Sequence, residues 1–88
     1  MRVLFRESFL KDIEALQDSA LKKRIRKAIA QVKEATALKD VGNIKKLKGG
    51  DLYYRIRMGE YRMGFVLEEN TVVFIRCLHR RDIYRYFP

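Results

Sequence analysis

Residues 52–67, LYYRIRMGEYRMGFVL, predict the β-hairpin around which the rest of the chain is arranged. Apolar and polar residues alternate on both sides of Gly59-Glu60, which is typical of strands that bury one face. A two-residue loop with glycine in the first place favours a type II′ turn, closed here by Met58 and Tyr61. The register of the two strands follows from that loop.

The predicted register makes one face of the hairpin basic and the other largely apolar. Arg57 lies across from Arg62, and Arg55 lies across from Gly64. Like charges opposite each other destabilise a sheet, so the pair makes sense if an anion sits between them. Gly64 has no side chain and leaves space for a ligand beside Arg55. We interpret this face as a phosphate site; the alternative is an ordinary solvated strand face with scattered arginines.

The composition indicates one small domain, residues 1–88, with a large basic surplus. A chain of 88 residues buries a modest core, so any active site is expected to be a shallow groove. Lys and Arg number 20 against 11 Asp and Glu, and the charge is −1 over residues 1–20 and +10 over residues 21–88. This concentration predicts attraction to a polyanion or to an acidic protein.

The cysteine content and the hydropathy argue against an exported or membrane protein. Cys77 is the single cysteine, and its apolar neighbours indicate a buried small residue rather than a nucleophile. No apolar run approaches the roughly 20 residues of a membrane span, and the N-terminus lacks the apolar segment of a signal peptide. We expect a cytoplasmic protein without membrane contact.

Before the hairpin, the sequence predicts one strand and two helices. Residues 2–6 are β-prone and are expected at an edge of the sheet, and a helix is expected to begin at Ser8. Asp18-Ser19 ends that helix and caps a second one. The apolar face of the second helix comprises Leu21, Ile25, Ala28, Ile29 and Val32, and its basic residues are Lys22, Lys23, Arg24, Arg26 and Lys27. Those basic residues could contact nucleic acid, but charge on the outside of an amphipathic helix is usually only solvated.

The remaining segments complete the predicted fold. Residues 36–51 lose the helical period and are expected to form a loop, with Ile44 and Leu47 under the sheet and the lysines outward. Residues 71–78, TVVFIRCL, favour a central strand buried on both faces. The order βααβββ predicts an α+β domain, in which two N-terminal helices pack as an antiparallel hairpin on a mostly antiparallel four-stranded sheet.

The residue inventory favours phosphate chemistry without a metal or other cofactor. There is one histidine, one cysteine and no clustered carboxylates, which disfavours metal sites and a Ser-His-Asp triad. Arginines and tyrosines can instead cleave RNA by aligning the 2′-hydroxyl with the adjacent phosphate and neutralising the developing charge. A tyrosine near arginines is a plausible base. His79 is either an acid or base or a structural hydrogen-bonder, and Tyr84 either stacks on a base or belongs to the core.

Three segments, KLKG at 46–49, YRIRMGEYR at 54–62 and HRRDIY at 79–84, resemble the RelE/ParE toxins of bacterial and archaeal type II toxin-antitoxin systems. The resemblance implies a ribosome-dependent mRNA endonuclease that enters the ribosomal A site and is inhibited by an antitoxin. The residues that it assigns to catalysis are Arg62, Arg80, Tyr84 and His79. It assigns Arg55 and Arg57 to RNA or phosphate binding, and we add Lys46 and Lys48, which are expected to point outward beside the entrance to the arginine face. Some members have lysines where this chain has Arg55 and Arg57, so the base is Tyr84 or His79.

Two other functions stay open. The ParE branch shares the fold but inhibits DNA gyrase and is no nuclease, and a nonenzymatic RNA-binding domain would bind without cleavage. The presence of Tyr84 together with four arginines favours the nuclease, because a gyrase inhibitor needs no such phosphate-binding cluster; the arginines are Arg55, Arg57, Arg62 and Arg80. Because the chain ends four residues after Tyr84, the expected acidic antitoxin has no long C-terminal helix to displace, and it would cover the basic face or wrap the helices.

Overall fold

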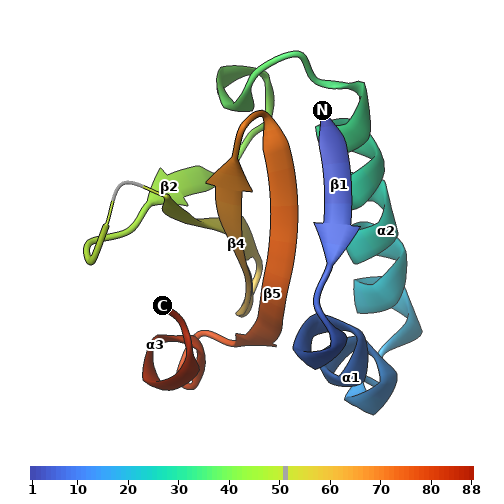
Figure 1. Cartoon of the computed structure of the whole chain (residues 1–88). Coiled ribbons are helices and arrows are strands. Elements are labelled where there is room, and N and C mark those ends of the chain that lie inside the picture. The colour runs from blue at the N-terminus through green and yellow to red at the C-terminus, as the bar shows by residue number, and fades with distance from the viewer. Residues whose placement is uncertain (51) are drawn as a thin grey trace.

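The computed structural model describes residues 1–50 and 52–88 (Figure 1). Its elements, in chain order, are β1 (Arg2–Phe5), α1 (Glu7–Ala15), α2 (Ser19–Glu34), the 3₁₀ turn η1 (Leu38–Asp40), β2 (Ile44–Lys46), β3 (Tyr53–Met58), β4 (Tyr61–Glu68), β5 (Thr71–His79) and α3 (Ile83–Tyr86). Asp51, the last residue of the expected loop, lies outside the described residues. The predicted combination of helices and a sheet in an α+β arrangement is confirmed.

The described strands form a five-stranded mixed sheet in the order β1-β5-β4-β3-β2. β1 runs parallel to β5 at one edge, and the other neighbouring pairs are antiparallel. The prediction of four strands was wrong because β2 lies inside the segment expected to be a loop. Three residues are too few to display a period of two, and β2 is a strand because the open edge of β3 offers it backbone partners, as in the pair Lys45 and Arg55.

The β3–β4 hairpin forms in the predicted register. Met58 pairs with Tyr61, and Arg57 with Arg62. Gly59 has φ 60, the positive value that the first position of a type II′ turn requires. The turn chemistry therefore sets which side chains share each face of the hairpin.

Helix α2 is fixed at both ends and buries four of the five residues of the predicted apolar face, while Ile29 is half-buried. The Asp18 carboxylate caps its first turn by accepting the Leu21 N–H at 3.0 Å. The α-amino group of Met1 donates to three carbonyls at its C-terminal end, where positive charge complements the helix dipole. Its buried residues are Leu21, Ile25, Ala28 and Val32.

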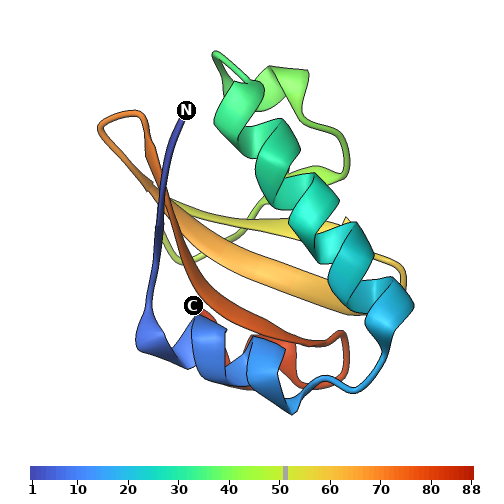
Figure 2. The same cartoon turned by 90° about the vertical axis from the view of Figure 1, so that its right-hand side faces the viewer.

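The two N-terminal helices do not form the expected antiparallel hairpin. Figure 2 shows α2 crossing the sheet diagonally, while α1 lies along one end of it. α1 packs chiefly on β5, and its one buried residue, Phe9, joins an aromatic cluster with Phe5 and Phe74. Each helix therefore buries its apolar stripe against the sheet, which removes the need to pair with the other helix.

Strand β5 lies inside the sheet, as predicted, but it is not buried along its whole length. Residues 72–74 are buried, whereas Ile75 and Arg76 are only half-buried. Cys77 is 1% exposed, and burial raises the pKa of its thiol to about 12. A neutral, inaccessible thiol confirms that Cys77 is a core residue rather than a nucleophile.

A bidentate ion pair fastens α1 to β5. Nε and Nη2 of Arg76 donate to the two carboxylate oxygens of Asp12 at 2.8 and 3.0 Å, and this bond raises the pKa of Arg76. The same carboxylate accepts the backbone N–H of Cys77 at 2.9 Å. The Arg76 guanidinium also lies 5.1 Å from the ring centre of Tyr86. A single carboxylate thus holds the helix, the strand and the cation in place.

We expect Asp12→Ala to lower the free energy of unfolding by about 2–3 kcal/mol. The substitution leaves the half-buried guanidinium of Arg76 and the backbone N–H of Cys77 without their hydrogen-bond acceptor. Urea unfolding measures this value. Glu14→Ala removes an exposed carboxylate from the same helix and serves as the control, with an expected change within about 0.5 kcal/mol. Equal effects of the two substitutions would contradict the anchoring role of Asp12.

Candidate phosphate-binding site

Arg62 stands at the centre of a cluster of cations. It lies opposite Arg57 in the hairpin, on the face that also carries Arg55. Partial burial lowers the pKa of Arg62, and the positive charges of Arg55, Arg57 and Arg80 lower it further, while Tyr84 acts in the opposite sense. These five side chains, from two strands and the segment after β5, are therefore close enough to interact electrostatically. The structure brings together five of the eight predicted site residues.

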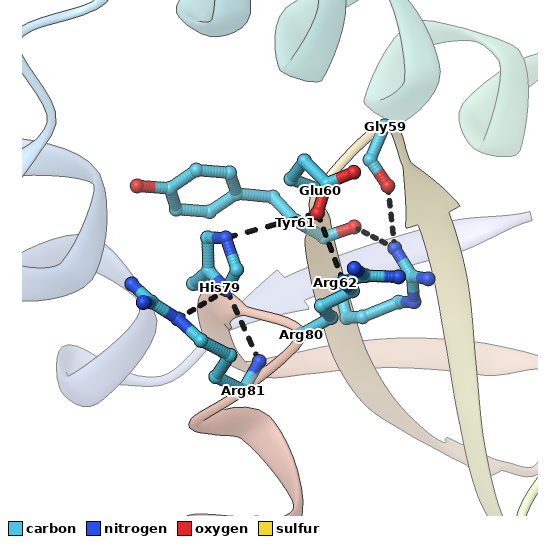
Figure 3. Close-up of polar contacts among 7 residues, drawn as sticks. All are labelled: Gly59, Glu60, Tyr61, Arg62, His79, Arg80 and Arg81. Carbon is cyan, nitrogen blue, oxygen red and sulfur yellow. Dashed lines mark hydrogen bonds and ion pairs between the residues drawn. The ribbon is translucent and has the colours of Figure 1, made fainter.

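The guanidinium of Arg62 is held in place by backbone. Its Nη1 donates to the carbonyl of Gly59 at 2.6 Å and to the carbonyl of Tyr61 at 2.9 Å (Figure 3). The side chain therefore folds back against the hairpin loop, and its position among the other arginines is fixed before any ligand arrives. Such preorganisation lowers the entropy that an anion must overcome to bind.

Arg55 contributes a donor without a partner. Its Nη1 donates to the carbonyl of Asn43 at 2.9 Å, the same carbonyl that accepts the backbone N–H of Arg57. Its Nε is buried and has no hydrogen-bond partner within the described residues. A buried donor that stays unsatisfied costs free energy. An anion near the cluster would relieve the repulsion among its guanidinium groups but would not reach this buried Nε.

The space expected beside Gly64 is not available to a ligand. A β-carbon on Gly64 would lie 2.5 Å from the ring of Phe87, which is only 2% exposed. The chain after α3 turns back onto this face of the sheet, and Phe87 also packs edge-on against Tyr53 with ring centres 5.7 Å apart. Gly64 therefore admits the chain's own C-terminal aromatic residue instead of a ligand, which corrects the interpretation from sequence.

Glu60 is a residue that the sequence prediction missed. It lines the same hollow as three arginines of the cluster and forms an ion pair with Arg80, Oε2 to Nε 2.9 Å, while the backbone N–H of Arg80 donates to its carbonyl. Both side chains are mostly exposed, so the pair contributes at most about 1 kcal/mol. A phosphate could replace this carboxylate at little cost. The signal in the sequence was its position in the loop between Arg57 and Arg62.

His79 adjoins the cluster through Glu60, although its strand position differs from that of Arg62. It pairs with Tyr61 across the sheet, so strand alternation puts it on the face opposite to Arg62, and its ring meets that of Tyr61 edge-on. Its Nδ1 accepts the backbone N–H of Arg81 at 3.1 Å and the Nε of that residue at 3.2 Å, and its Nε2 lies 3.9 Å from Glu60 (Figure 3). These contacts are those of a residue that shapes the turn carrying Arg80.

Tyr84 and the lysines before β3 form a second hollow. Its lining residues are Lys45, Lys46, Leu47, Lys48, Tyr84 and Pro88. Tyr84 is 56% exposed, so it is no core residue, and the three lysines are exposed as predicted. An exposed phenol ring beside cations suits a nucleobase and its phosphate. Since Tyr84 also interacts with Arg62, this hollow adjoins the arginine cluster.

The described residues provide no metal site and no membrane span. No group of three or more His, Cys, Asp or Glu side chains in residues 1–50 and 52–88 is placed to hold a metal ion. Among the helices of these residues, none is long and apolar enough to cross a membrane.

Comparison with known proteins identifies relatives over the whole chain. The family model described as the ParE toxin of the type II toxin-antitoxin system parDE matches residues 3–84. Toxin RelE3 of Methanocaldococcus jannaschii is 43% identical over 89 residues, which span 100% of both chains. The RelB-RelE antitoxin-toxin complex from Methanococcus jannaschii matches with a TM-score of 0.82 at 40% identity, over 97% of this chain and 99% of that one. The RelE-RelB complex from Pyrococcus horikoshii OT3, at 23% identity and TM-score 0.73 over 90% and 93% of the two chains, shows the fold alone.

The contact between Gly64 and Phe87 can be tested by a double-mutant cycle. We expect Gly64→Ala to lower the free energy of unfolding by about 1–3 kcal/mol, because the added methyl group meets the Phe87 ring. In a Phe87→Ala background, which is itself destabilised by the lost aromatic packing, Gly64→Ala should cost much less. Urea unfolding of the four proteins gives the coupling. An equal cost of Gly64→Ala in both backgrounds would refute the packing described.

Proposed function

The chain belongs to the RelE/ParE superfamily of type II toxins, and from this premise we propose that it is a ribosome-dependent endoribonuclease. It would enter the ribosomal A site and cleave the messenger RNA there, without a metal ion. The observation that carries the proposal is the clustering of Arg55, Arg57 and Arg80 around Arg62, with Tyr84 beside them. Inhibition of a protein partner does not require such a concentration of phosphate-binding groups on one face.

In the proposed reaction, the 2′-oxygen attacks the adjacent phosphorus while the bond from phosphorus to the 5′-oxygen breaks. The products are a 2′,3′-cyclic phosphate and a 5′-hydroxyl, with one proton leaving the 2′-hydroxyl and one reaching the 5′-oxygen. Arg62 and Arg80 bind the non-bridging oxygens and neutralise the charge that develops on them. Because the backbone already holds Arg62, this stabilisation needs little rearrangement.

We assign to Tyr84 the removal of the proton from the 2′-hydroxyl, and solvent water supplies the proton that the 5′-oxygen takes up. Tyr84 is the exposed phenol beside Arg62, whereas the Nδ1 of His79 is engaged by Arg81 and its Nε2 faces Glu60. His79 then acts by positioning the turn that carries Arg80. Lys46 and Lys48, which line the hollow around Tyr84, bind the phosphate of a neighbouring nucleotide.

We further propose that a cognate acidic antitoxin covers the basic face. Two similar structures are complexes of RelE with RelB, one of them with a toxin 40% identical to this chain. With a net charge of +9, the toxin attracts acidic segments strongly. A segment lying over the arginine cluster would exclude RNA from it.

The second candidate is a ParE-like inhibitor of DNA gyrase. The observation in its favour is the description of the matching family model, which names a ParE toxin. The arginine cluster and the 43% identity to a protein named RelE3 favour the nuclease.

The decisive experiment is expression in a bacterial host followed by primer extension on a reporter message. We expect cuts in the translated message and none in the same message without its start codon, since cleavage depends on the ribosome. Growth arrest with intact RNA would refute the nuclease, and a gyrase supercoiling assay would then test the alternative.

Substitutions in the cluster should abolish cleavage without unfolding the protein. We expect Arg62→Ala and Arg80→Ala each to reduce the rate on programmed ribosomes by about 100- to 1,000-fold, through lost charge stabilisation. Tyr84→Phe should reduce it by about 100-fold or more, through lost proton transfer. Arg85→Ala removes an exposed charge next to Tyr84 and is the matched control, with an unchanged rate.

The variant His79→Gln separates a positioning role from catalysis. If His79 were the base, His79→Gln would slow cleavage as much as Tyr84→Phe and would change the pH dependence of the rate. We expect a reduction of about tenfold at most and an unchanged pH profile.

A folded Arg62→Ala protein with full activity would remove Arg62 from the site.

A further inference from the structure

One face of α2 extends the arginine cluster beyond the hairpin. Arg24, Lys27 and Gln31 stand three and four residues apart, so they lie on the same side of the helix. They face Gly42, Asn43 and the end of β3 across a groove. We call this the α2 groove; its lining residues are Arg24, Lys27, Ala28, Gln31, Val41, Gly42, Asn43, Ile56, Arg57 and Met58.

The α2 groove is continuous with the hollow of the arginine cluster. Both are lined by Arg24, Asn43 and Arg57. Arg24 lies against the hairpin loop, with Nη1 3.3 Å from the point that a β-carbon on Gly59 would occupy. The helix therefore supplies a further guanidinium beside the loop to which Arg62 is bonded, and the basic surface continues along α2.

The charges of the α2 groove are all of one sign. Three cationic side chains line it, namely Arg24, Lys27 and Arg57, and no carboxylate does so among the residues described there. Asn43 adds a side-chain amide that can donate to an anion, while its backbone carbonyl is already engaged by Arg55 and Arg57. A groove with cations along both walls fits a chain of phosphates.

We propose that the α2 groove binds the phosphate backbone of the RNA strand beside the cleaved nucleotide, with Arg24 and Lys27 as phosphate contacts. The inference rests on the proposed function, because that function brings the scissile phosphate to Arg62. The strand would then run from the arginine cluster past the hairpin loop and along α2. Contacts of this kind hold the strand in register and carry no sequence information.

The chain provides a matched control on the same helix. Arg24→Ala/Lys27→Ala and Lys23→Ala/Arg26→Ala each remove two positive charges and add two alanines. Lys23 and Arg26 are exposed and do not line the α2 groove. A loss of general electrostatic attraction would affect both double variants equally, whereas loss of phosphate contacts would affect only the first.

The test measures the affinity of the full chain for a short, fluorescent single-stranded RNA with 2′-O-methyl groups, by anisotropy at a series of salt concentrations. Each phosphate contact on a single strand contributes about 0.7 to the slope of log affinity against log salt. We expect Arg24→Ala/Lys27→Ala to reduce the slope by about 1.4 and to weaken binding at low salt. Lys23→Ala/Arg26→Ala should keep the wild-type slope, and thermal unfolding should show both variants folded.

Three results would overturn the inference: equal slopes in the two double variants, no salt-dependent binding by the wild type, or weakened antitoxin binding with an unchanged RNA slope. The last would assign the α2 groove to the antitoxin. The reporter experiment separates this inference from the proposed function. If the wild type binds RNA through Arg24 and Lys27 but leaves translated messages intact, the nuclease fails and the α2 groove stands as an RNA site.

Discussion

Arg57 and Arg62 lie opposite each other across the β3–β4 hairpin, and the rest of the structure must offset their repulsion. Two guanidinium groups at neighbouring positions repel each other and destabilise the sheet. The opposite face compensates, because Ile56 and Met63 pair directly behind them and are almost fully buried against the helices. Apolar burial on one side thus stabilises a charge arrangement on the other side that would not form by itself.

The outer elements hold this hairpin without covering its charges. Asp12 fastens α1 to β5 through Arg76, and β5 in turn pairs with β4 over eight positions. On the basic face, Phe87 fills the space above Gly64 and fixes the short C-terminal segment that presents Tyr84. These packed neighbours hold the site in place and leave Arg80 and Tyr84 exposed beside Arg62.

The sequence predicted best those features that local chemistry determines. The two-residue loop defined the hairpin register, and alternation then defined its basic and apolar faces. Strand β2 was not predicted, because a strand of three residues is stabilised by its pairing with β3 and shows no pattern of its own in the sequence. The same holds for the site: Arg24 and Glu60 join the cluster through tertiary contacts, and Gly64 looked like open space because Phe87 returns from far along the chain. His79 was proposed as an acid or base from its residue type, and nothing in the sequence indicated that Arg81 engages its Nδ1.

The electrostatics of the cluster connect the proposed catalysis with the proposed inhibition by an antitoxin. Cations held close together raise the free energy of the unbound toxin, and any anion that enters lowers it. An RNA phosphate and an acidic antitoxin segment would both be stabilised by neutralising these cations, so the binding of one would exclude the other. The ion pair of Glu60 with Arg80 is a weak internal version of such neutralisation, and its exposure keeps it easy to displace. In the proposed mechanism, one set of fixed charges therefore serves both cleavage and its inhibition.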